Sequence, residues 1–417
     1  MRVTTAFNKL LGLNATFVQA VAFEPDHTTV TVRLARKRLR CPDCKYATRS
    51  VYDHRPKPSK WRHLDVCGRP LMIACSLRRL TCPTHGVRTE QVPFARPGAR
   101  VTHDFENLVV WCVTSMDRTA ATVLCRVAWR TVNAIIERVV PTTPDLSRIE
   151  GLVHIGVDEI SWKRGHKYLT LVVDHDTGDV IWGAKDRTAA TLEAFFEALG
   201  EDKTAELKAI SMDFGAPYAK AAREKAPGAA ICLDPFHAVA MATKALDETR
   251  RDLVNEMKKI DPDAAKAFKA TRWVLLHNPE NLTDAQAKQL RKLKRGGRGI
   301  WRAYQLKEAL RTIYSDHTLN FDDSRWLLDK WISRAQRSQL PEFIKLAKTL
   351  RSRFEEVTNA WFYGITNARN EGTHSAIRTI FARAHGFHTA EAALSTINLV
   401  CGPTPIPGPH PSIAQAA

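Results

Sequence analysis

Two aspartates in the sequence each follow a short apolar segment. Residues 152–158 read Leu-Val-His-Ile-Gly-Val-Asp, and residues 207–213 read Leu-Lys-Ala-Ile-Ser-Met-Asp. Both segments have the length and apolar content of a buried β-strand, so each predicted strand ends in a carboxylate, that of Asp158 or Asp213. Carboxylate oxygens are the ligands that hard divalent cations prefer. If folding brings the two strand ends together, repulsion between the carboxylates favours a bound metal ion.

The segments around these aspartates predict an α/β domain built on a mixed β-sheet. Apolar runs predict five strands, at residues 152–158, 167–173, 179–184, 207–213 and 229–233. Amphipathic patterns predict helices at residues 188–200 and 217–226. The order βββαβαβ is that of a ribonuclease-H-like fold. In that fold the fourth strand lies beside the first, so Asp158 and Asp213 would meet in a crevice, whereas Glu159 would point to the opposite face.

Two short motifs in the first hundred residues have the spacing of zinc ligands. In each, two ligands are separated by two residues, with a proline after the first ligand. The four candidate ligands are Cys41, Cys44, Cys82 and His85. This set suits one tetrahedral Zn²⁺ in a closed structural site. Cys67 and Cys75 lie between the motifs as rival ligands. The alternative is that Cys41, Cys44 and Cys82 are ordinary buried cysteines and that His85 is a loop residue.

The charge of the chain indicates a polyanionic partner. The formal net charge is +18, and residues 1–100 carry 19 Lys and Arg against 6 Asp and Glu. This concentration predicts a phosphate-facing surface, with a merely solubilising charge as the alternative. No apolar run has the length of a membrane span, and the N-terminus lacks a secretory pattern. We therefore expect a cytoplasmic protein that binds DNA and has no membrane partner.

Residues 103–140 have a helical pattern throughout, and residues 118–138 resemble a helix-turn-helix. Its small core is expected to comprise Ala121, Leu124, Val127, Val132, Ile135 and Ile136. The residues expected to contact DNA are Arg118, Arg130, Thr131 and Asn133. An ordinary helical hairpin would have a comparable pattern, so the basic module before this segment is what favours DNA binding.

Four separate motifs resemble one known family. Residues 155–162, 211–218, 234–237 and 366–372 are similar, in this order, to the motifs of the ISL3 group of insertion-sequence DDE transposases. That family carries a zinc-binding domain and a helix-turn-helix before its catalytic domain. The resemblance extends over roughly residues 30–400. It implies a bacterial DNA transposase that binds the terminal inverted repeats of its element and catalyses metal-dependent strand cleavage and strand transfer.

The resemblance also implies the composition of the active site. The family's acidic triad corresponds to Asp158, Asp213 and Glu371, which would hold two Mg²⁺ or Mn²⁺ ions. Asp234 and His237 match an Asp-x-x-His motif and would support the site, although Asp234 also suits a helix cap. Arg378 follows Glu371 by seven residues, on the same face of a helix, and would hold a DNA phosphate.

The segment between Asp213 and Glu371 has a helical pattern almost everywhere after residue 235 and is implied to contain a helical insertion domain. Residues 288–302 are strongly basic and are predicted to clamp the DNA backbone, with a solvated face as the alternative. The clamp residues are Arg291, Lys292, Lys294 and Arg295. We expect Trp326, Trp331 and Trp361 to pack between helices rather than to stack on bases.

The chain is therefore predicted to contain six consecutive segments. These are a zinc-binding module (1–95), a helix-turn-helix (96–148), the first part of the catalytic domain (149–235), a helical insertion (236–362), the end of the catalytic domain (363–400) and a disordered Pro-rich tail (401–417). Joining two element ends requires at least a dimer. The alternatives are a DNA-binding regulator derived from a transposase, and a metal-dependent nuclease of the same fold.

Overall fold

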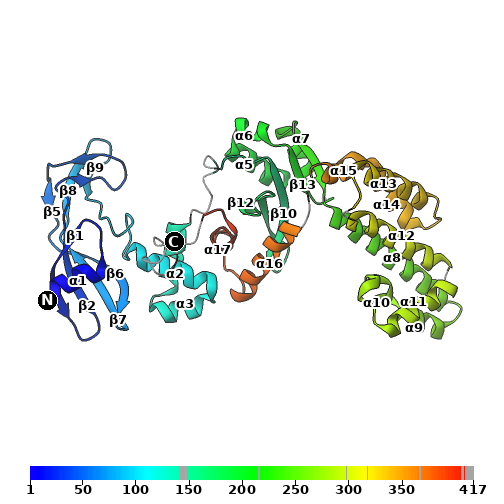
Figure 1. The fold of residues 1–417 in the computed structure, drawn as a ribbon, viewed down its shortest axis with the longest axis horizontal. Coiled ribbons are helices and arrows are strands. Elements are labelled where there is room, and N and C mark those ends of the chain that lie inside the picture. Colours follow the sequence, from blue (N-terminus) through cyan, green and yellow to red (C-terminus); the bar gives the residue numbers. More distant parts are fainter. Residues whose placement is uncertain are drawn as a thin grey trace. The chain divides into compact units, whose positions relative to one another are not determined.

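The computed structural model describes residues 1–140, 146, 149–214, 217–296, 298–316, 318–365, 368–404 and 408. Within these ranges, only the backbone is described for residues 235, 296, 298 and 368–371. The chain divides into two compact units, residues 1–141 with 404–417, and residues 142–403 (Figure 1). None of the described helices combines the length and apolar composition of a membrane-spanning segment. Most of the predicted tail lies outside the described residues.

The first unit begins with a short helix and two small groups of strands. Helix α1 (Val3–Leu11) precedes a sheet in the order β1-β2-β7-β6. Its strands are β1 (Thr16–Phe23), β2 (Thr28–Leu34), β6 (Ser59–Val66) and β7 (Arg69–Cys75). The second group contains β3 (Leu39–Arg40), β4 (Ala47–Thr48), β5 (Asp53–His54), β8 (Arg78–Cys82) and β9 (Gly86–Thr89). Alternate residues of β2, including Val30 and Val32, are buried, as a half-buried strand requires.

Three helices follow, α2 (His103–Ser115), α3 (Arg118–Cys125) and α4 (Trp129–Val139). The fully buried Glu106 of α2 accepts hydrogen bonds from Arg96 and Arg138, which ties α2 to α4. Ala121, Val132, Ile135 and Ile136 lie in the core as predicted, and Val127 is half-buried. The prediction for Leu124 is wrong, because its side chain is 58% exposed and Cys125 is buried instead. Helix α3 ends at Cys125, and Arg126 adopts a left-handed conformation there.

The second unit is built on a five-stranded mixed sheet in the order β12-β11-β10-β13-β14. Its strands are β10 (His154–Lys163), β11 (Lys167–Asp174), β12 (Val180–Lys185), β13 (Ala209–Met212) and β14 (Ala230–Leu233). The first three strands are antiparallel neighbours, and β13 and β14 continue the sheet parallel to β10. The prediction that the fourth strand of this unit lies beside the first is confirmed.

Strand β10 is longer than predicted. It pairs with β13 only from His154 to Gly156, but it continues against β11 as far as Lys163. Asp158 therefore lies within a strand and not at its end, which corrects the sequence prediction. The physical reason is the hairpin with β11, whose backbone hydrogen bonds extend the strand past the acid. Asp158 still lies just beyond the last residue that pairs with β13.

Helices cover the sheet on both faces. Along the chain, α5 (Ala189–Leu199) and α6 (Glu201–Glu206) lie between β12 and β13, and α7 (Pro217–Lys225) lies between β13 and β14. Helices α16 (Ala368–Arg383) and α17 (Ala390–Cys401) are the last two helices of the unit. Val172 of β11 packs in the cluster that contains Phe195 of α5. The alternate residue Leu171 packs in the cluster that contains Ile377 of α16. Successive side chains of a strand point to opposite faces, so α5 and α16 lie on different sides of the sheet.

The segment between β14 and α16 is helical, as predicted, and none of its described residues belongs to a strand. The helices are α8 (Pro235–Lys258), α9 (Pro262–Lys269), α10 (Arg272–Leu276), α11 (Asp284–Gly296), α12 (Arg298–Ser315), α13 (Phe321–Gln336), α14 (Pro341–Ser352) and α15 (Phe354–Phe362). A short 3₁₀ turn, Pro279–Asn281, precedes α11. Trp331 is buried, and Trp361 is half-buried and stacks on Tyr314. The prediction for Trp326 is wrong, because this side chain is 59% exposed.

Candidate active site and DNA-binding elements

Asp158 contacts the helix that carries the third predicted acid. One carboxylate oxygen of Asp158, Oδ2, lies 2.8 Å from Nε2 of His374, which is a residue of α16. The other oxygen, Oδ1, accepts a hydrogen bond of 2.6 Å from the backbone N–H of Glu159. The hydrogen bond to Asp158 raises the pKa of the His374 imidazole above its usual value, although burial opposes this. Strand β10 and helix α16 are thus joined at the candidate site.

Asp213 has a corresponding histidine. It directly follows β13, and its Oδ1 lies 2.8 Å from Nε2 of His237. Oδ2 of Asp234 lies 3.7 Å from the same nitrogen. Possible ligand atoms of these three residues all lie within 4.8 Å of one another. The hydrogen bond to Asp213 raises the pKa of the His237 imidazole above its usual value, although burial opposes this.

Asp234 is also the N-cap of helix α8, in agreement with its interpretation as a helix cap. Its Oδ1 accepts a hydrogen bond of 2.8 Å from the backbone N–H of Phe236, which caps the helix. Its other oxygen faces His237. The cap fixes the start of α8 relative to the end of β14 and thereby places His237, in the first turn, next to Asp213.

Each of the two aspartates, Asp158 and Asp213, affects the pKa of both histidines. Asp158 contributes to the raised pKa of His237, and Asp213 contributes to that of His374. These mutual effects indicate that the two pairs share one electrostatic environment. Glu159, in contrast, pairs with Arg187 at 3.3 Å, in agreement with its predicted orientation away from Asp158.

Glu371 belongs to the first turns of α16, but its side chain lies outside the described residues. His374 follows Glu371 by three residues, so the two lie on one face of the helix. Arg378 is exposed, lies four residues after His374, and its charge opposes protonation of that imidazole. His374 was not among the predicted site residues. The sequence does contain a signal for it, because His374 follows Glu371 by three residues and precedes Arg378 by four, on one face of the helix.

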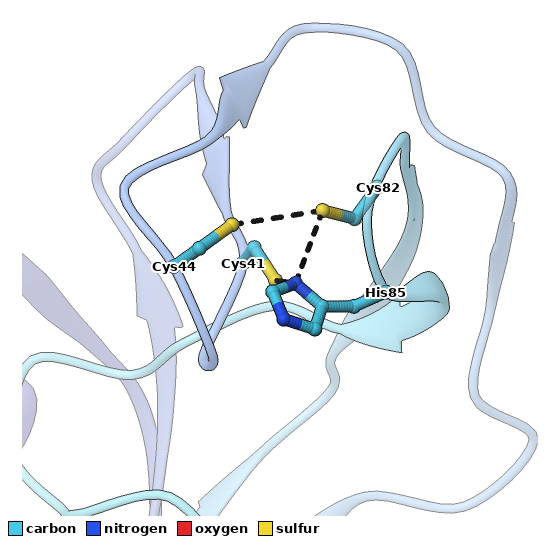
Figure 2. A group of neighbouring side chains, drawn as sticks. All are labelled: Cys41, Cys44, Cys82 and His85. Carbon is cyan, nitrogen blue, oxygen red and sulfur yellow. Dashed lines mark hydrogen bonds between the residues drawn. The ribbon is translucent and has the colours of Figure 1, made fainter.

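The four predicted zinc ligands come together in the first unit (Figure 2). Sγ of Cys41 lies 3.8 Å from Nδ1 of His85, and Sγ of Cys44 lies 3.6 Å from Sγ of Cys82. All four possible ligand atoms are within 4.8 Å of one another. A tetrahedral zinc site with Zn–S bonds of about 2.3 Å has sulfur atoms about 3.7 Å apart, so the geometry fits this ion.

The local electrostatics also suit a cation. Burial opposes ionisation of the Cys82 thiol, but hydrogen bonds from the backbone and side chain of His85 lower its pKa to about 6. A thiolate is the form that binds zinc. The rival ligands lie elsewhere, since Cys75 is in the core of the neighbouring sheet and Cys67 is exposed. Neither belongs to the cluster of possible ligands.

The predicted DNA-contacting residues of the helical segment differ in exposure. Arg130 is exposed, and Thr131 and Asn133 are half-buried, all in the first part of α4. Arg118 is only 7% exposed, and its Nη1 donates a hydrogen bond of 2.8 Å to Oδ1 of Asn133. This burial argues against the direct DNA contact predicted for Arg118. Its guanidinium holds Asn133 and connects α3 to α4.

The predicted clamp residues Arg291, Lys292, Lys294 and Arg295 are all exposed on α11. Within the described part of the chain, none of the four forms an ion pair, so their charges are available to an external anion. The Lys294 ammonium lies 5.8 Å from the centre of the Trp301 ring. Unlike a solvated face with balanced charges, this helix presents cations with few acids between them.

Comparison with known proteins identifies the family. A sequence model of the family described as "Transposase" matches residues 155–397, which is more than half of the chain. The model described as "Helix-turn-helix domain of transposase family ISL3" matches residues 90–140. The model described as "zinc-finger of transposase IS204/IS1001/IS1096/IS1165" matches residues 37–85. The chain belongs to the ISL3 family of transposases.

Individual members of the ISL3 family match along most of their length. The chain is 35% identical to the transposase for insertion sequence element IS1557 of Mycobacterium tuberculosis, over 100% of both chains. It is 26% identical to the transposase for insertion sequence element IS1001 of Bordetella parapertussis, over 88% of this chain and 90% of that protein. The ISL3 helix-turn-helix match covers helices α2 to α4, and the zinc-finger match spans all four clustered ligands.

Removal of a zinc ligand is expected to release the metal. The wild-type chain should contain about one zinc ion, whereas the double variant C41S/C44S should contain almost none, because only two of the four ligands remain. The zinc content of the purified protein, measured by inductively coupled plasma mass spectrometry, checks this expectation. The matched control is C67S, which changes an exposed cysteine outside the cluster and should retain zinc. Full zinc content in C41S/C44S would contradict the assignment.

Proposed function

We propose that this protein is the DNA transposase of a bacterial insertion sequence. It binds the terminal inverted repeats of its element and catalyses metal-dependent DNA cleavage and strand transfer with Asp158, Asp213 and Glu371. The observation that carries the proposal is the position of the acids. The parallel neighbours β10 and β13 bring Asp158 and Asp213 to one side of the sheet, and His374 joins the helix of Glu371 to Asp158.

The strand arrangement supports a ribonuclease-H-like catalytic domain. Three antiparallel strands are followed by two parallel ones, with α5 and α6 between β12 and β13, and α7 between β13 and β14. The first strand lies at the centre of the sheet, beside the fourth. In open α/β sheets of this kind, ligands bind at the switch point of the strand order, beyond the carboxyl ends of the strands. Asp213 directly follows such a strand end.

The chemistry of these side chains fits two Mg²⁺ or Mn²⁺ ions. Asp158 and Asp213 offer hard oxygen atoms, are partly exposed, and each lies 2.8 Å from a histidine nitrogen. When bound, a pair of such ions stabilises the attacking and leaving oxygens of a phosphoryl transfer. In the chain itself, His237 orients the Asp213 carboxylate, and Asp234 holds His237. In the proposed complex, the exposed guanidinium of Arg378 binds a DNA phosphate.

The remaining basic surfaces support binding of the DNA substrate. In the proposed arrangement, Arg130, Thr131 and Asn133 on α4 contact bases of the terminal repeats, and the basic zinc-binding module contacts phosphates. The exposed cations of α11 hold the DNA backbone. Synapsis of two element ends requires a homodimer or a higher oligomer, and the reaction takes place in the cytoplasm, where bacterial DNA lies.

Loss of one active-site carboxylate is expected to abolish joining but not binding. The variants D158N, D213N and E371Q keep the size of each side chain but lose its charge. Strand transfer should fall by roughly 10³-fold or more, because the loss of a metal ligand removes several kcal/mol of transition-state stabilisation. The assay mixes purified protein, Mg²⁺ and DNA carrying the element's ends, and measures joined products.

Glu159 provides a matched control for these variants. It is the neighbour of Asp158 in β10, but it pairs with Arg187, so E159Q should leave joining within a few-fold of wild type. Affinity for the same DNA in EDTA should be equal in all variants. Binding without any strand breakage by wild type would instead indicate a regulator, and cleavage without joining a nuclease. Normal joining by D158N would exclude the proposed mechanism.

Neutralisation of the α11 clamp is expected to weaken the salt dependence of DNA binding. Replacement of Arg291, Lys292, Lys294 and Arg295 by alanine should reduce the slope of log K against log salt by about 0.9 for each phosphate that is no longer neutralised. A variant with the same charge change on α13 and α14 is the control, with alanine at Lys330, Arg334, Lys345 and Lys348, which are all exposed. Equal slopes for wild type and the α11 variant would show that this face is merely solvated.

A further inference from the structure

A second basic site lies among the insertion helices, outside the carboxylate site and the α11 clamp. It is a pocket of about 460 Å³ between α8, α9 and α10. The charged and aromatic side chains that line it are Arg250, Arg251, Lys258, Lys269, Arg272 and Trp273. Among the described residues, no carboxylate belongs to the lining. Five cations with no lining acid make this pocket suitable for an anion.

The α8 part of the pocket is one face of the helix. Arg251, Asn255 and Lys258 follow one another at spacings of four and three residues, which places them on the same side. The acids Asp252 and Glu256 are exposed and are not part of the lining, since their positions belong to the other side of α8. The arrangement therefore separates cations from acids, which a merely solvated helix face with mixed charges would not do.

A buried aspartate orders the guanidinium groups behind this face. Asp247 lies 2.7 Å from Arg250, 3.0 Å from Arg251 and 3.5 Å from Arg272, and Asp247 and Arg250 are both almost fully buried. One carboxylate cannot neutralise three guanidinium groups. The Nε atom of Arg272 is buried and makes no hydrogen bond with the described residues. The arginines are thus preorganised while most of their positive charge remains uncompensated.

The two lysines add further positive charge at the opening of the pocket. Lys258 ends α8 and Lys269 ends α9, and both are exposed. Neither forms an ion pair within the part of the chain that the structure describes. A ligand that binds the guanidinium groups from the pocket side would therefore also meet two ammonium groups, as a chain of successive phosphates does.

Trp273 provides a different kind of surface in the same pocket. Its side chain is 57% exposed, so it does not belong to the core of the helical segment. The Arg272 guanidinium carbon lies 5.0 Å from the centre of the ring, and the His277 ring lies 5.9 Å from it. An exposed indole next to uncompensated cations is the combination that binds single-stranded nucleic acids, where a base stacks on the ring and cations hold the phosphates.

We propose that this pocket, formed by α8, α9 and α10, binds single-stranded DNA. An unpaired base stacks on Trp273, and the flanking phosphates contact Lys258, Lys269 and the arginines. Paired bases in a duplex are stacked on each other and do not expose a face to the ring, so the pocket prefers single strands. This proposal rests on the proposed function in one respect, namely that DNA is the polyanion which the protein handles.

The test compares two exposed tryptophans of the insertion helices. Binding of a fluorescein-labelled 12-nucleotide single strand to the full chain is measured by anisotropy in EDTA. The variant W273A should bind about 10-fold more weakly, since one base no longer stacks on an indole. The control W326A changes an equally exposed indole of α13 that does not line the pocket, and should match wild type. Affinity for a duplex of the same sequence should change less than two-fold in both variants.

A second variant and a modified probe separate stacking from charge. K258A/K269A should lower the salt slope of single-strand binding by about 1.4, at about 0.7 for each neutralised phosphate. With an abasic oligonucleotide, which keeps the phosphates but has no bases, W273A should equal wild type while K258A/K269A still binds more weakly. Weaker binding by the lysine variant alone would indicate a simple phosphate site and would overturn the single-strand proposal, as would equal binding by W273A and W326A.

The design keeps this proposal independent of the catalytic one. Binding is measured without metal, so absence of cleavage does not affect the result. If D158N joined DNA normally, the proposed function would fail and the pocket result would stand. If W273A bound normally, the pocket proposal alone would fail.

Discussion

Two carboxylates that share one side of a sheet repel each other, and a fold that holds them together must offset this repulsion. Here the backbone pairing of β10 with β13 fixes the distance between the strands that carry Asp158 and Asp213. Two histidines from different helices contact the carboxylates, since His374 lies against Asp158 and His237 against Asp213. The contacts explain why both imidazoles have a raised pKa.

The position of α16 depends on apolar packing as well as on the contact between His374 and Asp158. Ile377, on this helix, is fully buried against side chains of the sheet. Helix α17 packs closely on β12 at Gly183, where an added Cβ would lie 2.7 Å from Cδ2 of Leu394. The hydroxyl of Thr373 donates a hydrogen bond of 2.9 Å to the Gly178 carbonyl. The packing of Ile377 and the hydrogen bond of Thr373 hold α16 against the sheet.

Much of this architecture was predictable because it follows from local patterns. The strands and their order along the chain follow from apolar runs in the sequence. The zinc ligands follow from the spacing of the cysteines and the histidine. Other features depend on partners that are distant in sequence. Asp158 lies within its strand because β11 extends the pairing, and His374 acquires its role only when α16 reaches β10. Burial of Arg118 and exposure of Trp326 depend likewise on how neighbouring helices pack.

The central claim is that Asp158, Asp213 and Glu371 converge to hold metal ions. The most direct measurement is the anomalous diffraction of Mn²⁺ in crystals of the full chain bound to DNA with its element's end. The account predicts two manganese peaks about 4 Å apart, with oxygen atoms of all three carboxylates as ligands. Manganese that is bound without Glu371, or the absence of manganese between the two aspartates, would contradict it.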